Sequence, residues 1–96
     1  MQLRLKQSVL HLLETYITKT NEINPLLKLN CLQKMLELDE FNEHYMYLLL
    51  RFLIEQNKKQ ECVRCYERIK RKLIEELGVS IPDKIVKVYA DYMIHV

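Results

Sequence analysis

The sequence has 96 residues, the size of a single domain, with only one Gly and two Pro. Hydrophobic residues make up 49% of it and charged residues 29%. This composition excludes the disordered class and favours long helices with short connections. The net charge of +2 is too small to predict nucleic-acid binding from charge alone.

The cellular compartment can also be predicted. Charged residues begin at Arg4, so the N-terminus lacks the apolar core of a secretory signal. The longest apolar run, 45–54, includes Arg51 and is about half the length that crosses a bilayer. Three Cys, an odd number, without a signal peptide are typical of a reducing compartment. We therefore expect a cytoplasmic protein with no membrane role.

The first two helices are predicted over residues 3–19 and 25–38, where apolar residues recur at helical spacing. Asn24 and Pro25 begin the second helix, because Asn is a preferred N-cap residue and Pro lacks an N–H that the first turn does not use.

The third helix, 42–56, is apolar around nearly its whole circumference, apart from a polar strip of His44, Arg51 and Glu55. A helix of this kind has neighbours on several sides. We therefore expect the third helix in the middle of the fold.

The last two helices are bounded by turn residues. Asn57 ends the third helix, since Asn tolerates the left-handed conformation that a tight turn needs. The fourth helix then covers 59–77, and Gly78 follows as its C′ residue. Ser80 is predicted to cap the last helix in a box with Asp83. No segment alternates apolar and polar residues over a useful length, so the sequence predicts an all-α fold.

The fourth helix contains a spaced set of small and large side chains. Cys62, Tyr66 and Ile69 follow the turn at intervals of four and three residues. This spacing resembles the second helix of a tetratricopeptide repeat (TPR), in which a small residue lets two helices approach and an aromatic ring fills the gap one turn on. These three residues are the predicted core anchors. Thirty-four residues earlier the pattern is degenerate, because Lys28 occupies the position of the small residue.

The C-terminal part narrows the choice of family. Residues 66–79 read Y-E-R-I-K-R-K-L-I-E-E-L-G-V, followed by a Pro-containing link and a helix with Tyr89. This pattern is similar to the end of the bacterial transcriptional activator domain, and its E-E-L-G-V block is the most specific part. The resemblance covers residues 29–93 well and the first helix only by position. The sequence departs from the family pattern at Asn57, where Gly is usual, and at Ile81, where Pro is usual, so the turn geometry is open.

The resemblance implies a fold and a context. The fold is TPR-like antiparallel helical hairpins, about five helices in a short right-handed solenoid over residues 1–96. The family context is a larger regulator, either a SARP-type activator or a response regulator, whose winged-helix domain binds DNA. We therefore expect part of a longer protein, with a protein partner: the adjacent DNA-binding or receiver domain, another copy, or RNA polymerase. The alternatives are a free-standing TPR-like adaptor unrelated to transcription and a small nucleic-acid-binding domain that uses the fourth helix.

Few residues suggest catalysis, redox function or metal binding. Cys62 and Cys65 form a CxxC pair, but no second pair accompanies it, so packing is preferred over metal or redox function. The histidines, His11, His44 and His95, are dispersed and lack a plausible nucleophile with an orienting carboxylate. We therefore expect a protein that is not an enzyme and has no cofactor or metal.

Two surfaces are candidates for binding a partner. Arg64, Arg68 and Arg71 form a basic side of the fourth helix, although acidic residues share this helix and a solvated face is the alternative.

The other candidate surface is on the first helix, which has two apolar stripes. One stripe is expected to pack on the second helix and consists of Leu5, Val9, Leu12, Leu13 and Tyr16. Leu3, Leu10 and Ile17, spaced by sevens, form the other stripe. We expect these three residues to dock a partner if they are exposed; the alternative is that they pack inside the chain.

Overall fold

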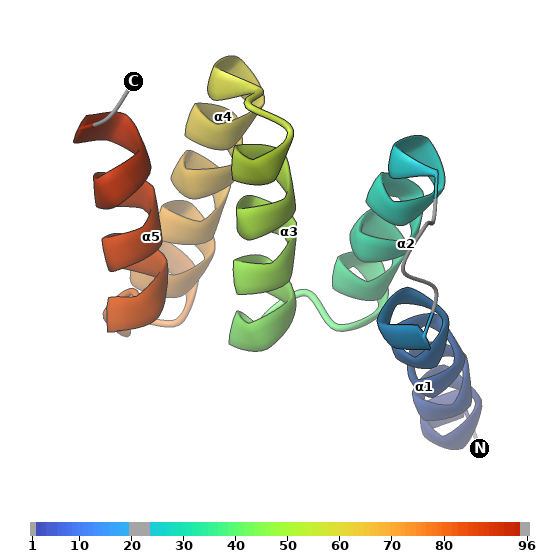
Figure 1. Cartoon of the computed structure of the whole chain (residues 1–96). Helices are drawn as coiled ribbons and strands as arrows, with labels where there is room; N and C mark the ends of the chain where they lie inside the picture. The colour runs from blue at the N-terminus through green and yellow to red at the C-terminus, as the bar shows by residue number, and fades with distance from the viewer. Residues whose placement is uncertain (1, 20–23, 95–96) are drawn as a thin grey trace. The chain divides into compact units, whose positions relative to one another are not determined.

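The computed structural model describes residues 2–19 and 24–94, with side chains described for 7–17 and 24–94. All regular secondary structure in this part of the chain is helical (Figure 1). The predicted all-α fold class is therefore confirmed. The chain forms two compact units, which divide between Glu40 and Phe41.

The first unit contains helices α1 (Gln2–Lys19) and α2 (Pro25–Leu38), which contact each other. The start of α2 is as predicted. Pro25 is its first residue, and the side-chain oxygen of Asn24 accepts a hydrogen bond from the backbone N–H of Leu26 at 2.8 Å. This bond satisfies one of the N–H groups that a helix start leaves without a partner in the helix.

The buried face of α1 differs from the prediction. Leu10 is buried, whereas Leu12 is 67% exposed and Tyr16 is 44% exposed. The prediction that Leu12 and Tyr16 pack inside the chain is therefore wrong. Both stripes of α1 are apolar, so helical spacing alone does not choose between them, and the structure uses the side of the helix that contains Leu10.

The second unit contains α3 (Glu43–Glu55), α4 (Lys59–Lys70), a π-helical segment η1 (Arg71–Glu76) and α5 (Asp83–Ile94). Helices α3, α4 and α5 run alternately up and down (Figure 1), and α3 contacts both α4 and α5. Six residues of α3 are buried, as expected for a helix with neighbours on more than one side: Tyr45, Met46, Leu49, Leu50, Phe52 and Leu53.

The turns of the second unit follow their sequence signals. The side chain of Asn42 caps α3 by accepting a hydrogen bond from the Tyr45 N–H at 3.0 Å. Asn57 has a φ of +55° and Gly78 a φ of +68°, so both adopt the predicted left-handed conformation. Beyond Gly78, the N–H of Val79 donates to a carbonyl of the preceding helical turn, as in a Schellman end.

Two details of the second unit were not predicted. The fourth helix changes from α to π geometry at Arg71, although the same residue types form both kinds of turn and spacing does not separate them. The last helix begins at Asp83, and the Pro82 carbonyl accepts hydrogen bonds from the N–H groups of Ile85 and Val86. Ser80 lies too far before this start to act as its N-cap, so that prediction is wrong.

Candidate functional site

The predicted repeat anchors lie on the inner side of α4. Cys62 is 0% exposed and Ile69 is 3% exposed. Tyr66 is half-buried, and its ring stacks on that of Tyr89 from α5, with centroids 4.0 Å apart and planes inclined by 4°. The small Cys62 side chain and the paired rings therefore lie on the part of α4 that faces the rest of its unit.

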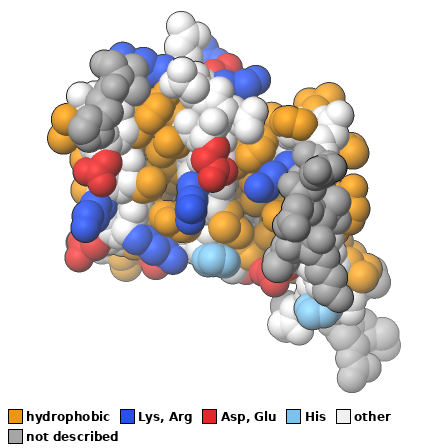
Figure 2. Space-filling view, viewed as in Figure 1, with side chains coloured by type: hydrophobic (Ala, Val, Ile, Leu, Met, Phe, Trp, Pro, Cys, Tyr) orange, Lys and Arg blue, Asp and Glu red, His pale blue; other side chains and the backbone are white. Residues whose placement is uncertain are grey.

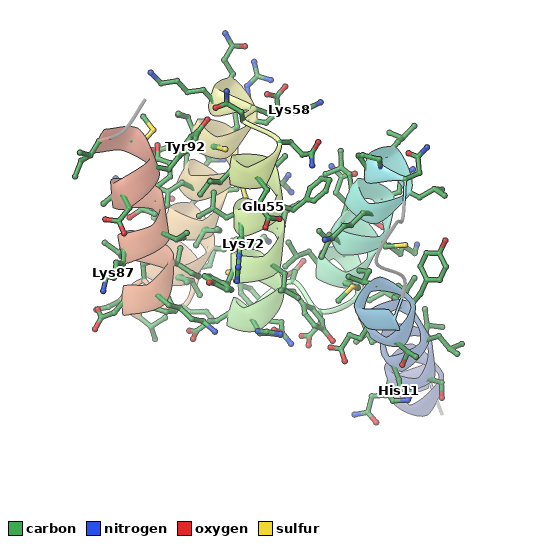
Figure 3. All side chains as sticks on the ribbon, viewed as in Figure 1. His11, Glu55, Lys58, Lys72, Lys87 and Tyr92 are labelled. Atoms are coloured by element: carbon green, nitrogen blue, oxygen red, sulfur yellow. The ribbon has the colours of Figure 1, made fainter. Side chains whose placement is uncertain are left out.

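A hydrogen bond connects the turn between α3 and α4 to the last helix. The hydroxyl of Tyr92 donates to the side-chain oxygen of Asn57 at 2.8 Å, and it also lies within hydrogen-bonding reach of the Cys62 thiol. Figure 3 shows Tyr92 near the end of α5, on the same side of the unit as the turn that carries Lys58. This connection could not be predicted from the sequence, because 35 residues separate its two partners.

The two thiols of the CxxC pair are buried and free. Burial raises the pKa of Cys65 to about 12, against the opposing charge of Arg68. Burial, followed by the charge of Glu61, also raises the pKa of Cys62. Both groups are therefore neutral thiols near pH 7, and a neutral thiol is a poor nucleophile and a poor metal ligand. This chemistry supports packing as the role of the pair.

Two lysines of the second unit lie over aromatic rings. The Nζ of Lys72 is 5.2 Å from the centroid of Phe41 and 3.7 Å from a carboxylate oxygen of Glu76. The Nζ of Lys84 is 5.0 Å from the centroid of Tyr47. Each lysine is thus held by a cation–π contact between segments that are distant in the sequence.

The candidate basic residues Arg64, Arg68 and Arg71 are all exposed on the outer side of the fourth helix. On the face shown in Figure 2, Lys and Arg side chains are interspersed with Asp and Glu. Such a mixed distribution is typical of a solvated surface.

The candidate docking residues of α1 do not form one exposed stripe. Leu10 is 8% exposed and Ile17 is half-buried. The side chain of Leu3 lies outside the described residues. Docking was expected only if these residues are exposed, and Leu10 does not meet that condition, so the alternative of packing inside the chain holds at this position. Docking through Leu3 and Ile17 stays a prediction.

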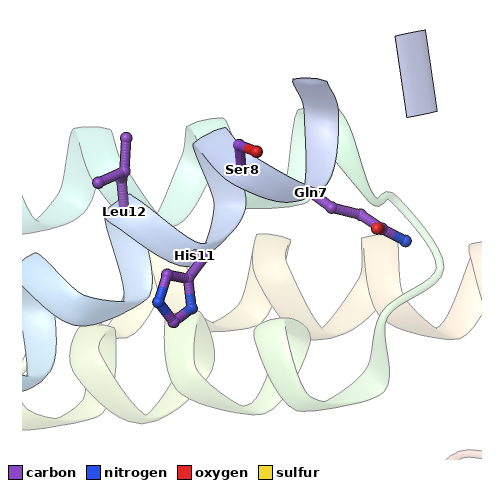
Figure 4. Close-up of a pocket in the computed structure, with 4 residues that line it drawn as sticks. All are labelled: Gln7, Ser8, His11 and Leu12. Carbon is purple, nitrogen blue, oxygen red and sulfur yellow. The ribbon is translucent and has the colours of Figure 1, made fainter. Parts of the chain in front are cut away.

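The outer side of α1 carries a shallow depression of about 430 Å³ lined by Gln7, Ser8, His11 and Leu12 (Figure 4). All four residues come from neighbouring turns of one helix, and His11 and Leu12 are exposed. His44 is also exposed, on α3, and His95 lies outside the described residues. The depression therefore lacks the convergent polar groups from several elements that mark a small-molecule site.

Among the side chains described, those of residues 7–17 and 24–94, no three His, Cys, Asp or Glu come together as metal ligands would. In the part of the chain that the structure describes, no helix has the length and apolar character that crossing a bilayer requires.

Comparison with known proteins identifies the family. Residues 2–91 match the family model of the bacterial transcriptional activator domain. No curated protein and no solved structure matches the chain. The family match covers both compact units and extends from the first turn of α1 almost to the end of α5. The chain therefore belongs to the bacterial transcriptional activator domain family.

Proposed function

We propose that this chain is a protein-interaction module of a cytoplasmic transcriptional regulator. It would dock a neighbouring domain, another copy or the transcription machinery, while a separate domain binds DNA. The family match over residues 2–91 carries this proposal, because it supports a transcriptional context. The free thiols of Cys31, Cys62 and Cys65 support a reducing compartment.

The surface of the first unit supports an interaction role. Leu12 is 67% exposed and Leu26 is 65% exposed, with Tyr16 and Leu27 also exposed. Single apolar residues are common on protein surfaces, and exposed apolar side chains mark an interaction site where they form one patch. Their removal from water by a protein partner would stabilise a complex by about 25 cal/mol for each Å² buried.

A reporter experiment tests this proposal. The chain would be fused to an unrelated DNA-binding protein whose operator lies upstream of a weak bacterial promoter, and transcription would be measured. We expect activation, and we expect Leu12→Asp with Tyr16→Asp to reduce it. Asn30→Asp with Gln33→Asp is the matched control, because it adds the same two charges at exposed polar positions of the same unit. A folded fusion protein that gives no activation and captures no other protein would contradict the proposal.

A further inference from the structure

The outer side of the fourth helix presents a straight row of guanidinium groups. Arg64, Arg68 and Arg71 are spaced by four and three residues, so they fall within an arc of about 60° and extend over roughly 10 Å. All three are exposed, whereas Cys65 and Ile69 between them are buried. Arg71 keeps α-helical dihedral angles (φ −63°, ψ −44°), so it continues the direction of α4. We call these three residues the arginine row.

The arginine row has no ion-pair partner within the part of the chain that the structure describes. Glu67 is four residues before Arg71, a spacing that permits a pair, yet the observed ion pairs of the second unit are Arg51–Glu55 and Lys72–Glu76. The charges of the row are therefore available to another molecule.

The chemistry of the row favours carboxylates arranged along a line. An Arg guanidinium can donate two parallel hydrogen bonds to one carboxylate, a geometry that Lys does not offer. A phosphate can accept the same two parallel hydrogen bonds from an Arg guanidinium. The residues beside the row therefore decide whether it favours a carboxylate or a phosphate. At about 100° per residue, Glu61 and Glu67 flank the row on opposite sides. A broad phosphate surface such as duplex DNA would meet both carboxylates, whereas a single narrow segment would lie between them.

We propose that the arginine row binds an acidic helical segment of a partner protein, whose Asp or Glu side chains recur at intervals of three and four residues. Such a segment places its carboxylates on one face, at the same rise per turn as the three arginines. The proposal rests on the proposed role of this chain as a protein-interaction module. The partner segment is acidic because its charge must complement that of the three arginines.

A peptide-binding experiment tests the proposal on the whole chain. The probe is a labelled helical peptide with Glu at positions i, i+4 and i+7, and its control has Gln at those positions. We expect the Glu peptide to bind, the Gln peptide to bind at least about tenfold more weakly, and affinity to fall as salt increases. The triple variant Arg64→Glu, Arg68→Glu, Arg71→Glu should lose at least about tenfold in affinity for the Glu peptide.

A matched charge reversal controls for net charge. Lys58→Glu, Lys59→Glu and Lys87→Glu change exposed lysines away from the row by the same total charge, and we expect less than about a threefold effect. Equal losses in the two triple variants would overturn the proposal, as would equal binding of the Glu and Gln peptides. Tighter binding of duplex DNA than of the Glu peptide, lost in the row variant, would show a nucleic-acid surface instead. Circular dichroism melts establish that both variants remain folded.

The same variants separate this inference from the proposed function. Reporter activation that survives reversal of the arginine row, with no binding of the Glu peptide, would leave the interaction module intact and overturn the role of the row. Peptide binding that depends on the row, in a chain that gives no activation and captures no other protein, would support the acidic-segment site and contradict the transcriptional function.

Discussion

The ring of Tyr66 on α4 lies parallel to the ring of Tyr89 on α5, with centroids 4.0 Å apart. Neither residue is fully buried, so this stack forms a half-exposed contact between two helices that are joined only through η1 and its following link. We therefore expect the stack of Tyr66 on Tyr89 to contribute to the stability of the second unit.

Tyr66→Ala should lower the free energy of unfolding by about 2–3 kcal/mol, somewhat less than truncating a fully buried aromatic. Tyr89→Ala should act on the same contact. A double-mutant cycle should therefore give a coupling energy of about 0.5–1.5 kcal/mol, measured by urea denaturation. Tyr16→Ala, at an exposed position outside the stack, is the control and should not couple to Tyr89→Ala. Additive effects of Tyr66→Ala and Tyr89→Ala would show that the rings do not interact in solution.

The second prediction concerns the turn at Asn57, which combines a positive φ with the hydrogen bond from Tyr92. Asn57→Gly tolerates the positive φ but removes the acceptor of the Tyr92 hydrogen bond. Asn57→Ala removes that acceptor and also places a Cβ in the left-handed conformation. We expect Asn57→Ala to be less stable than Asn57→Gly by about 1 kcal/mol, since left-handed geometry costs a residue with a Cβ about 1–2 kcal/mol. Thermal melts of the two variants measure this difference in stability.

Tyr92→Phe provides the companion test. It removes the donor and leaves the turn backbone unchanged, so its effect should be smaller than that of Asn57→Ala. Combining Tyr92→Phe with Asn57→Gly should add little to Asn57→Gly alone, because both changes remove the same bond. A fully additive combination would argue that the two side chains act independently.

The third prediction is a loss of stability at alkaline pH. The pKa of Cys65 rises from 9.0 to about 12 on folding, and the pKa values of Cys62, Tyr89 and Tyr92 are raised as well. The folded chain therefore holds these protons more tightly than the unfolded chain. The contribution of Cys65 is fully present below about pH 9 and is lost as the pH rises toward 12.

Urea denaturation at a series of pH values measures this loss. The buried Cys65 thiol can contribute up to about 1.4 kcal/mol per pH unit between its unfolded and folded pKa. Cys65→Ala should reduce the slope of stability against pH above about pH 9, even though it also removes packing volume. Cys31→Ala is the matched control for loss of a thiol outside the buried pair. An unaltered slope in Cys65→Ala would contradict the idea that the raised pKa of Cys65 causes the loss of stability at alkaline pH.

The fourth prediction compares two neighbouring leucines of α1. Leu10 is 8% exposed and Leu12 is 67% exposed. Leu10→Ala should therefore destabilise the first unit by about 2–3 kcal/mol, within the range for truncating a buried Leu, while Leu12→Ala should stay within about 0.5 kcal/mol. Hydrogen exchange of the α1 and α2 amides reports on this unit directly. The reverse order would show that α1 buries the stripe containing Leu12 in solution.

Much of the local structure could be predicted from the sequence. Asn24 with Pro25 starts α2, Asn57 makes the turn before α4, and Gly78 follows the fourth helix, all as expected. Each of these features depends on backbone preferences and hydrogen bonds within a few residues. The basic row at Arg64, Arg68 and Arg71 was also predicted from spacing, whereas the absence of an ion pair to it among the described residues could not be.

The sequence by itself therefore determined the helical class, most helix boundaries and the family. The helices and their ends depend on backbone preferences within a few residues, and the E-E-L-G-V block is specific to the family. Only the tertiary structure decided that α1 buries Leu10 rather than Leu12, that Tyr66 stacks on Tyr89, and that Tyr92 binds Asn57. These outcomes depend on which surfaces meet after folding. Two apolar stripes on one helix have nearly equal local free energies, and packing against the neighbouring elements selects one of them.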